Sequence, residues 1–148
     1  MSAPSRHVGS LTAGETLFES ELGGVTQLSA ASWPILTGMS IKRITLAPGA
    51  MREPQWNVDA NQLAYVVTGT VLVSILGNGD SFSTFVVPAG QMYHVESGAI
   101  YHIENIGEDE AEIVAALRAD RPRHFSLRDG FSAMTDAVLG NTYDLPSS

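Results

Sequence analysis

Four side chains in the middle of the chain could bind a small molecule or move a proton. Gln55, Asn57 and Gln62 lie in the stretch GAMREPQWNVDANQLAYVVTG, residues 49–69, and Tyr101 lies in a second glycine-containing stretch. Amides both donate and accept hydrogen bonds, and a phenol releases its proton with an unperturbed pKa of about 10. Side chains of these types indicate hydrogen-bonding or acid–base chemistry wherever one interior brings them together.

The elements that must position these residues are expected to be short strands. β-Branched and aromatic runs are interrupted by glycine or proline about every eight to twelve residues, a pattern typical of all-β sandwiches and barrels. The expected strands are residues 40–46, 61–76, 81–87, 91–95, 99–105 and 111–117. Turns are expected at residues 77–80, 88–90 and 105–111, because Asn and Gly tolerate the positive φ that tight turns require.

The two ends of the chain differ from this strand pattern, although the length predicts a single domain. Residues 1–38 are expected to form an N-terminal arm packed on the barrel, with strands near 7–11 and 25–29. Residues 39–122 form the expected barrel core. Residues 123–148 predict a short helical tail, with Ser126 as N-cap, a break near Gly130 and a stop at Gly140.

Composition limits the classes of partner and the compartment. Sixteen acidic residues against eight basic ones give a net charge of −8, which would repel nucleic acid, so no nucleic-acid partner is expected. The absence of cysteine excludes disulfides and thiolate metal sites. No stretch has the apolar length of a signal peptide or a membrane span, so a cytoplasmic protein without a membrane partner is expected.

The spacing of two motifs resembles that of the cupins, in the branch of the oxalate decarboxylases, germins and legumin-type seed globulins. In the first motif, Gly49, Gln55, Asn57, Gln62 and Gly69 occupy the glycine, His, His, Glu and glycine positions. In the second motif, Gly90, Glu96, Gly98, Tyr101 and Asn105 occupy the glycine, proline, glycine, His and Asn positions. The resemblance covers roughly residues 40–145 and implies an all-β jelly-roll barrel around a small central cavity.

The resemblance also implies where a metal ion would bind, and the residues at those positions have changed. Cupins of this branch hold manganese, iron or a similar ion with three histidines and one glutamate. Gln55, Asn57, Gln62 and Tyr101 now stand at those four positions. Neutral amides and a phenol are weak donors that supply no charge, so no metal and no other cofactor is expected. The four residues either form a polar core filled by water or bind a small organic molecule.

Arg52 bears on that choice. It stands three residues before the first metal-ligand position, like an arginine beside the substrate of oxalate decarboxylases, and the resemblance places it inside the barrel. Strict alternation from Gln55 places it outside, unless the strand is irregular near Pro54. An inward guanidinium could hold a carboxylate, whereas an outward one could pair with Glu53.

The sequence leaves open whether the protein is an enzyme. A metal-free isomerase, cyclase or lyase could use Tyr101 as acid or base, with His94 as a weaker candidate. His102 is expected to face away from Tyr101, because adjacent strand residues point to opposite faces. An oxalate decarboxylase-like metalloenzyme is disfavoured, since the strand 111–117 offers only Glu112 as an acid.

Outward-facing apolar residues point to a covering surface. Trp56, Leu63 and Tyr65 are expected on the outer face by alternation, where the N-terminal arm or a second subunit would cover them. A homodimer is therefore the expected assembly, and a small molecule is the expected ligand.

Overall fold

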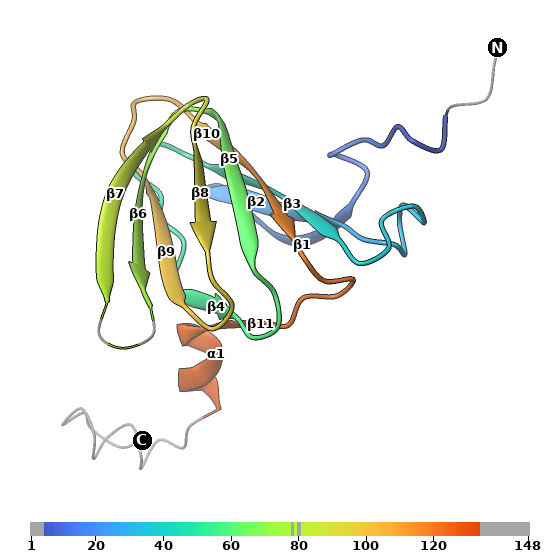
Figure 1. Cartoon of the computed structure of the whole chain (residues 1–148). Coiled ribbons are helices and arrows are strands. Elements are labelled where there is room, and N and C mark those ends of the chain that lie inside the picture. The colour runs from blue at the N-terminus through green and yellow to red at the C-terminus, as the bar shows by residue number, and fades with distance from the viewer. Residues whose placement is uncertain (1–4, 78, 80, 134–148) are drawn as a thin grey trace.

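Two antiparallel sheets face each other and enclose the interior of the protein (Figure 1). The structure is a computed structural model that describes residues 5–77, 79 and 81–133. The strands are β1 (Glu15–Ser20), β2 (Gly23–Leu28), β3 (Ser40–Leu46), β4 (Gln55–Asn57), β5 (Gln62–Thr68), β6 (Thr70–Leu76), β7 (Phe82–Pro88), β8 (Met92–Val95), β9 (Ile100–Asn105), β10 (Ala111–Leu117) and β11 (His124–Ser126). A short helix, α1 (Leu127–Ser132), follows at one end of the barrel.

The strand order is that of a jelly-roll barrel. One sheet has the order β1-β2-β3-β10-β5-β8 and the other has the order β11-β4-β9-β6-β7. Strands that are consecutive in the chain therefore often lie in different sheets, as β4 and β5 do. The jelly-roll fold expected from the sequence is confirmed.

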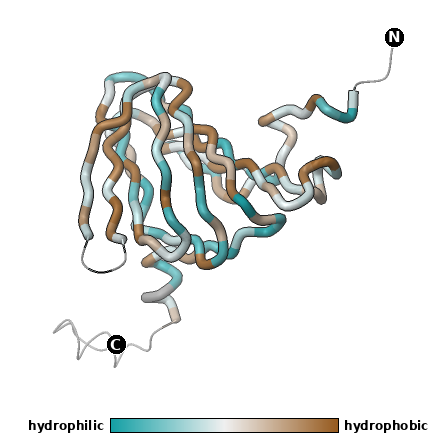
Figure 2. Tube along the Cα trace, in the orientation of Figure 1, coloured by the Kyte–Doolittle hydropathy of each residue, from teal (hydrophilic) through white to brown (hydrophobic). Residues whose placement is uncertain are grey.

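Alternation along the strands decides which side chains enter the interior. In β3 and β10 every second residue is buried, and the intervening residues are half-buried on the outer face. The hydropathy of the chain alternates in the same way along many of the strands (Figure 2). The apolar core lies between the sheets and includes Ile44, Ile103 and Ile113, each no more than 1% exposed.

The sequence-based expectation for the N-terminal arm is only partly correct. Residues 7–11 form no strand, whereas Glu15–Ser20 form β1, which pairs with β2. β2 in turn pairs with β3 over Gly23–Leu28, so both strands extend a barrel sheet. The apolar residues of β1 are exposed, which explains why alternation gave no signal for this strand.

The C-terminal expectation is also corrected in part. Residues 124–126 are strand β11, paired with β4, before the helix begins. Ser126 is the N-cap as expected: its Oγ accepts a hydrogen bond from the Asp129 backbone N–H at 3.2 Å, and Asp129 Oδ2 accepts one from the Ser126 N–H at 3.1 Å. α1 passes through Gly130 and ends at Ser132, two residues beyond the position near which a break was expected. Gly140 lies outside the described residues.

Asn105, the last residue of the second motif, anchors a turn. Its Nδ2 donates to the Leu46 carbonyl at 2.9 Å and to the Asp109 carbonyl at 2.8 Å, and its Oδ1 accepts from the Gly107 N–H at 3.0 Å. The side chain is 1% exposed. Because these bonds join β9, β3 and the 105–110 turn, this motif position supports the fold rather than the interior site.

Candidate functional site

One part of the interior is polar, where β4, β5 and β9 come together. Gln55, Asn57, Gln62 and Tyr101 are 0%, 1%, 1% and 2% exposed. Gln55 lies in register with Tyr101 across β4 and β9, while Gln62 enters from the opposite sheet. The structure therefore brings together the four residues that the motif spacing singled out.

These four side chains satisfy one another only in part. Asn57 Nδ2 donates to Gln62 Oε1 at 3.2 Å, and the Tyr101 hydroxyl donates to the same oxygen at 3.1 Å. Within the described part of the chain, the buried atoms without a partner are Ser40 Oγ, Gln55 Nε2, Asn57 Oδ1, Gln62 Nε2 and the Tyr93 hydroxyl. Since a buried unpaired polar group costs about 1 to 3 kcal/mol, these atoms require a partner other than the described side chains.

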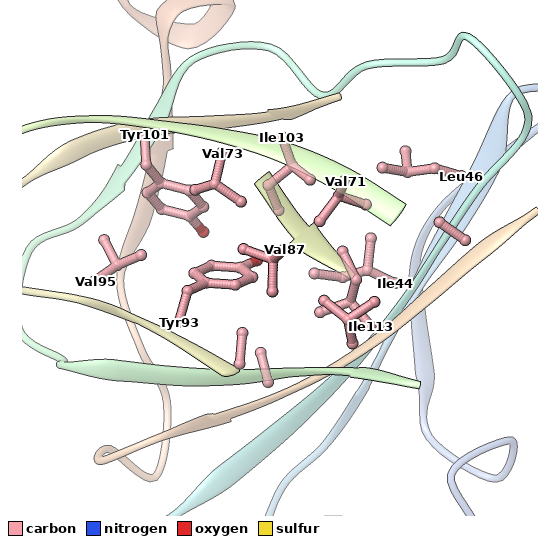
Figure 3. Close-up of a cluster of buried hydrophobic side chains, with 14 of the residues drawn as sticks. Ile44, Leu46, Val71, Val73, Val87, Tyr93, Val95, Tyr101, Ile103 and Ile113 are labelled. Atoms are coloured by element: carbon pink, nitrogen blue, oxygen red, sulfur yellow. The ribbon is translucent and has the colours of Figure 1, made fainter. Parts of the chain in front are cut away.

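Two phenols enter the interior from opposite sheets. Tyr93 lies on β8 and Tyr101 on β9, and Figure 3 shows both rings between Val73, Val87 and Val95. Burial raises the pKa of both hydroxyls, although the positive charge of Arg52 acts in the opposite direction. Tyr101 is therefore protonated near neutral pH and acts as a hydrogen-bond donor rather than as a base.

Arg52 lies beside these phenols. Its side chain is half-buried, and its backbone N–H donates to the Ile103 carbonyl at 2.8 Å outside the regular pairing of β4. Burial lowers the pKa of its guanidinium, while Tyr101, Tyr93 and the carboxylate of Glu53 raise it. The influence of Tyr101 and Tyr93, which is larger than that of Glu53, favours the inward one of the two orientations open from the sequence.

A second cation in this interior was missed by the sequence reasoning. Lys42 is 4% exposed and belongs to the inward-facing set of β3. Burial, with a smaller effect from the charge of Arg52, lowers the pKa of Lys42 to about 8. The signal that could have revealed it is the alternation of Lys42 with Ile44 and Leu46, both of which are core residues.

His124 was also missed, because it lies outside both motifs. It begins β11, where it pairs with Asn57, and its Nε2–H donates a hydrogen bond to Gln55 Oε1. Burial is the largest cause that lowers the pKa of His124 to about 4, and the charges of Lys42 and Arg52 lower this pKa further. The imidazole is therefore neutral at pH 7.

The acidic residues near this region form hydrogen bonds or ion pairs with groups outside the polar interior. Glu53 Oε2 accepts a hydrogen bond from the Arg128 backbone N–H at 3.1 Å, and Asp129 caps α1. Glu112 pairs with Arg43 at 2.9 Å on the outer face of the sheet. Among the described residues, neither Lys42 nor Arg52 forms an ion pair.

Other residues considered from the sequence lie away from the interior. His94 is exposed, on the face of β8 opposite to Tyr93, which removes it as a candidate for interior acid–base chemistry. His102 is half-buried and faces away from Tyr101, as expected. Trp56 faces outward and stacks on Phe125 of β11 at a centroid distance of 5.9 Å, so the C-terminal strand covers it rather than the N-terminal arm.

The fold and the motif positions are those of one protein family. The cupin family model matches residues 9–148. The chain belongs to the cupin family. This cupin is 33% identical to the oxalate oxidase GF-2.8 of Triticum aestivum over 103 residues, which cover 66% of the chain and 46% of the oxidase. It is 32% identical to germin-like protein 3-3 of Oryza sativa subsp. japonica, over 66% of the chain and 45% of that relative.

Solved oxalate decarboxylases have the same fold. The Bacillus subtilis enzyme, which has Mn(II) centres, superimposes with a TM-score of 0.84 at 23% identity, covering 92% of this cupin and 36% of the enzyme. The Lactobacillus farciminis enzyme in complex with formate gives a TM-score of 0.85 at 20% identity, covering 93% and 40%. The cupin spans less than half the length of these proteins and of the plant relatives. Identities this low in the solved structures establish the fold and not the activity.

The donor set of this cupin does not fit the transition-metal ion that the family implies. Three amides and a phenol with a raised pKa replace the imidazoles and the carboxylate, so no donor carries a negative charge near pH 7. Lys42 and Arg52 add positive charge beside them. Nowhere in residues 5–77, 79 and 81–133 do three or more His, Cys, Asp or Glu residues form a group that could hold a metal ion.

Within the described residues, no helix has the length and apolar character needed to cross a membrane.

Proposed function

We propose that this cupin binds a small carboxylate-bearing organic molecule in its polar interior, without a transition-metal ion. The observation that carries the proposal is the pair of cations, Lys42 and Arg52, that face this interior with no ion-pair partner among the described residues. A buried charge without a partner is costly, and a carboxylate would form charge-assisted hydrogen bonds with a guanidinium.

The neutral groups around the cations support a small oxygen-rich ligand. Gln55 Nε2 and Gln62 Nε2 are donors without a described partner, and the Tyr93 hydroxyl can either donate or accept. Such donors would bind the second carboxylate oxygen, a hydroxyl or a carbonyl of the same molecule. The names of the relatives and structural neighbours include oxalate and formate, both of which are small carboxylates.

The proposal is tested first by thermal unfolding in the presence of oxalate, malonate, formate or lactate. A ligand that binds only the native state raises its stability, by about 2.7 kcal/mol at about 100 times its dissociation constant. At least one of these acids is expected to raise the melting temperature of the wild type by several degrees. Lactamide, which has the shape of lactate without its charge, is expected to cause no shift.

Two variants localise the binding. Arg52→Met is expected to lose most of the shift, whereas Arg121→Met, which removes an exposed arginine, keeps it. If none of the acids shifts the wild type, or if Arg52→Met responds as the wild type does, carboxylate binding in the interior is wrong.

Metal analysis tests the other half of the proposal. Protein purified without added metal is expected to contain manganese, iron and zinc well below one ion per chain. Stoichiometric metal that remains after dialysis against a chelator would overturn metal-independent binding.

A further inference from the structure

Lys42 is the only lysine among the 148 residues, and it lies in the interior. Lysine is almost never fully buried unless it is paired, because its ammonium group is strongly hydrated. Within the described part of the chain, the Lys42 amine forms neither a hydrogen bond nor an ion pair. An unpaired lysine at a buried position is therefore a candidate for a chemical role.

Lys42 begins a row of inward-facing residues that crosses the larger sheet to Tyr93 of the polar interior. Along the sheet, Lys42 lies in register with Ala115 of β10, Ala115 with Ala64 of β5, and Ala64 with Tyr93 of β8. All four side chains face inward, and the two between Lys42 and Tyr93 are only methyl groups. Two alanines, Ala115 and Ala64, therefore lie between Lys42 and Tyr93 in this row.

The environment also keeps part of the amine neutral. Burial and the charge of Arg52 lower the pKa of Lys42 to about 8, so about a tenth of the molecules carry a neutral amine at pH 7. Fewer than about one in a thousand exposed lysines are neutral at that pH. Only the neutral amine is a nucleophile, and a desolvated lysine beside another cation is a known way to generate it.

We propose that Lys42 forms a Schiff base with the carbonyl carbon of a small oxo acid whose carboxylate pairs with Arg52. This inference rests on the carboxylate site proposed above and narrows its ligand to acids that also carry a ketone or aldehyde. The ligand would be attached covalently to Lys42, and forming this bond requires neither a metal ion nor another cofactor.

The reaction is a condensation in which atoms and charge balance. The Nζ lone pair attacks the carbonyl carbon, a C–N bond forms, and the carbonyl oxygen becomes the hydroxyl of a carbinolamine by taking a proton from the nitrogen. That hydroxyl takes a further proton from solvent and leaves as water, which gives a protonated imine. The protonated imine can then accept the electrons of a C–H or C–COO⁻ bond at the adjacent carbon, which gives an enamine, as is required for isomerisation or for decarboxylation of a 3-oxo acid.

The test is reductive trapping of the full chain with pyruvate and cyanoborohydride at pH 7, followed by peptide mass mapping. Hydride reduces the imine to a stable secondary amine, and Lys42 is expected to gain one N-(1-carboxyethyl) group per chain. The only other aliphatic amine is the N-terminal α-amino group, which the mapping separates from Lys42. Acetone, a ketone without a carboxylate, is expected to label Lys42 far less.

Matched variants assign the labelling. Arg52→Met is expected to lower trapping of pyruvate about tenfold or more, because a charge-assisted pair is lost. Lys42→Arg removes the nucleophile, and Arg118→Lys added to it places the only lysine at an exposed position. That exposed lysine is expected to remain essentially unlabelled under the same conditions.

The outcomes separate the covalent site from the carboxylate site. Labelling at Lys42 that depends on Arg52 supports the Schiff base. Labelling confined to the α-amino group, or equal labelling of the exposed lysine, overturns it. If lactate shifts the melting temperature of the wild type while Lys42 stays unlabelled, the carboxylate site stands and the Schiff base is overturned. If none of the four acids shifts the melting temperature and Lys42 is unlabelled, both are overturned.

Discussion

At the scale of single residues, Lys42 and Arg52 should weaken the empty protein. Both groups lose hydration in the interior, and each repels the other. Natural proteins accept such destabilisation mainly at functional sites, where strained or charged groups act on a ligand. The free energy of unfolding should therefore change when Lys42 is replaced.

We predict that Lys42→Met raises the free energy of unfolding at pH 7 by about 1 to 3 kcal/mol. The pKa of this lysine falls from about 10.5 in the unfolded chain to about 8 in the folded protein. Below pH 8 both states bind the proton, and the folded state bears the whole cost of burying the charge. From pH 8 to 10.5 the unfolded chain binds more protons, so the stability of the wild type rises with pH.

Urea unfolding of both proteins at pH 7 and at pH 10 measures this difference. The advantage of Lys42→Met should shrink as the pH rises, and tyrosine ionisation cancels because it is common to both proteins. A constant advantage across this range would show that the Lys42 amine does not titrate with a lowered pKa.

The residues of this site differ in how visible they are in the sequence. Gln55, Asn57 and Gln62 were found because motif spacing fixes their place relative to two glycines. Lys42 was missed because lysine is rarely buried, although its alternation with Ile44 and Leu46 in SIKRITL places it on the more apolar face of the strand. His124 reaches Gln55 across 69 residues of sequence, through a pairing of β11 with β4 that local patterns do not encode.

At the scale of elements, the glycine turns of the two motifs place the strands that carry the site. Gly69 has a φ of +82° and connects β5 of one sheet to β6 of the other. A Cβ at Gly69 would lie 2.9 Å from Cα and Cβ of Ala111. Gly98, in the turn before β9, has nearly the same φ of +83°, but nothing lies within 4 Å of its added Cβ.

We therefore predict that Gly69→Ala is more destabilising than Gly98→Ala. Both substitutions force alanine into the left-handed region, which costs about 1 to 2 kcal/mol. Only Gly69→Ala must also displace the backbone of β10, which adds about 1 to 3 kcal/mol. Urea unfolding of the two variants gives the difference directly, and equal losses would mean that β10 moves aside without cost.

At the scale of the whole molecule, one face of the larger sheet remains apolar and exposed. Leu63, Tyr65, Val67 and Met92 on β5 and β8 are 49%, 42%, 39% and 61% exposed. Tyr65 and Met92 lie opposite each other across the two strands, so these side chains form one continuous patch. Contiguous apolar patches of this kind on a protein surface commonly mark an interaction surface.

We predict that the protein forms a homodimer through the outer face of β5 and β8. Tyr65→Asp would place a charge at the centre of the interface, where burial without a partner is costly, and should convert the dimer to a monomer. Sedimentation equilibrium measures the mass of both proteins. Phe82→Asp is the control, because Phe82 is also exposed, at 67%, but lies at the edge of the other sheet on β7. A monomeric wild type, or dissociation caused by Phe82→Asp but not by Tyr65→Asp, would contradict this interface.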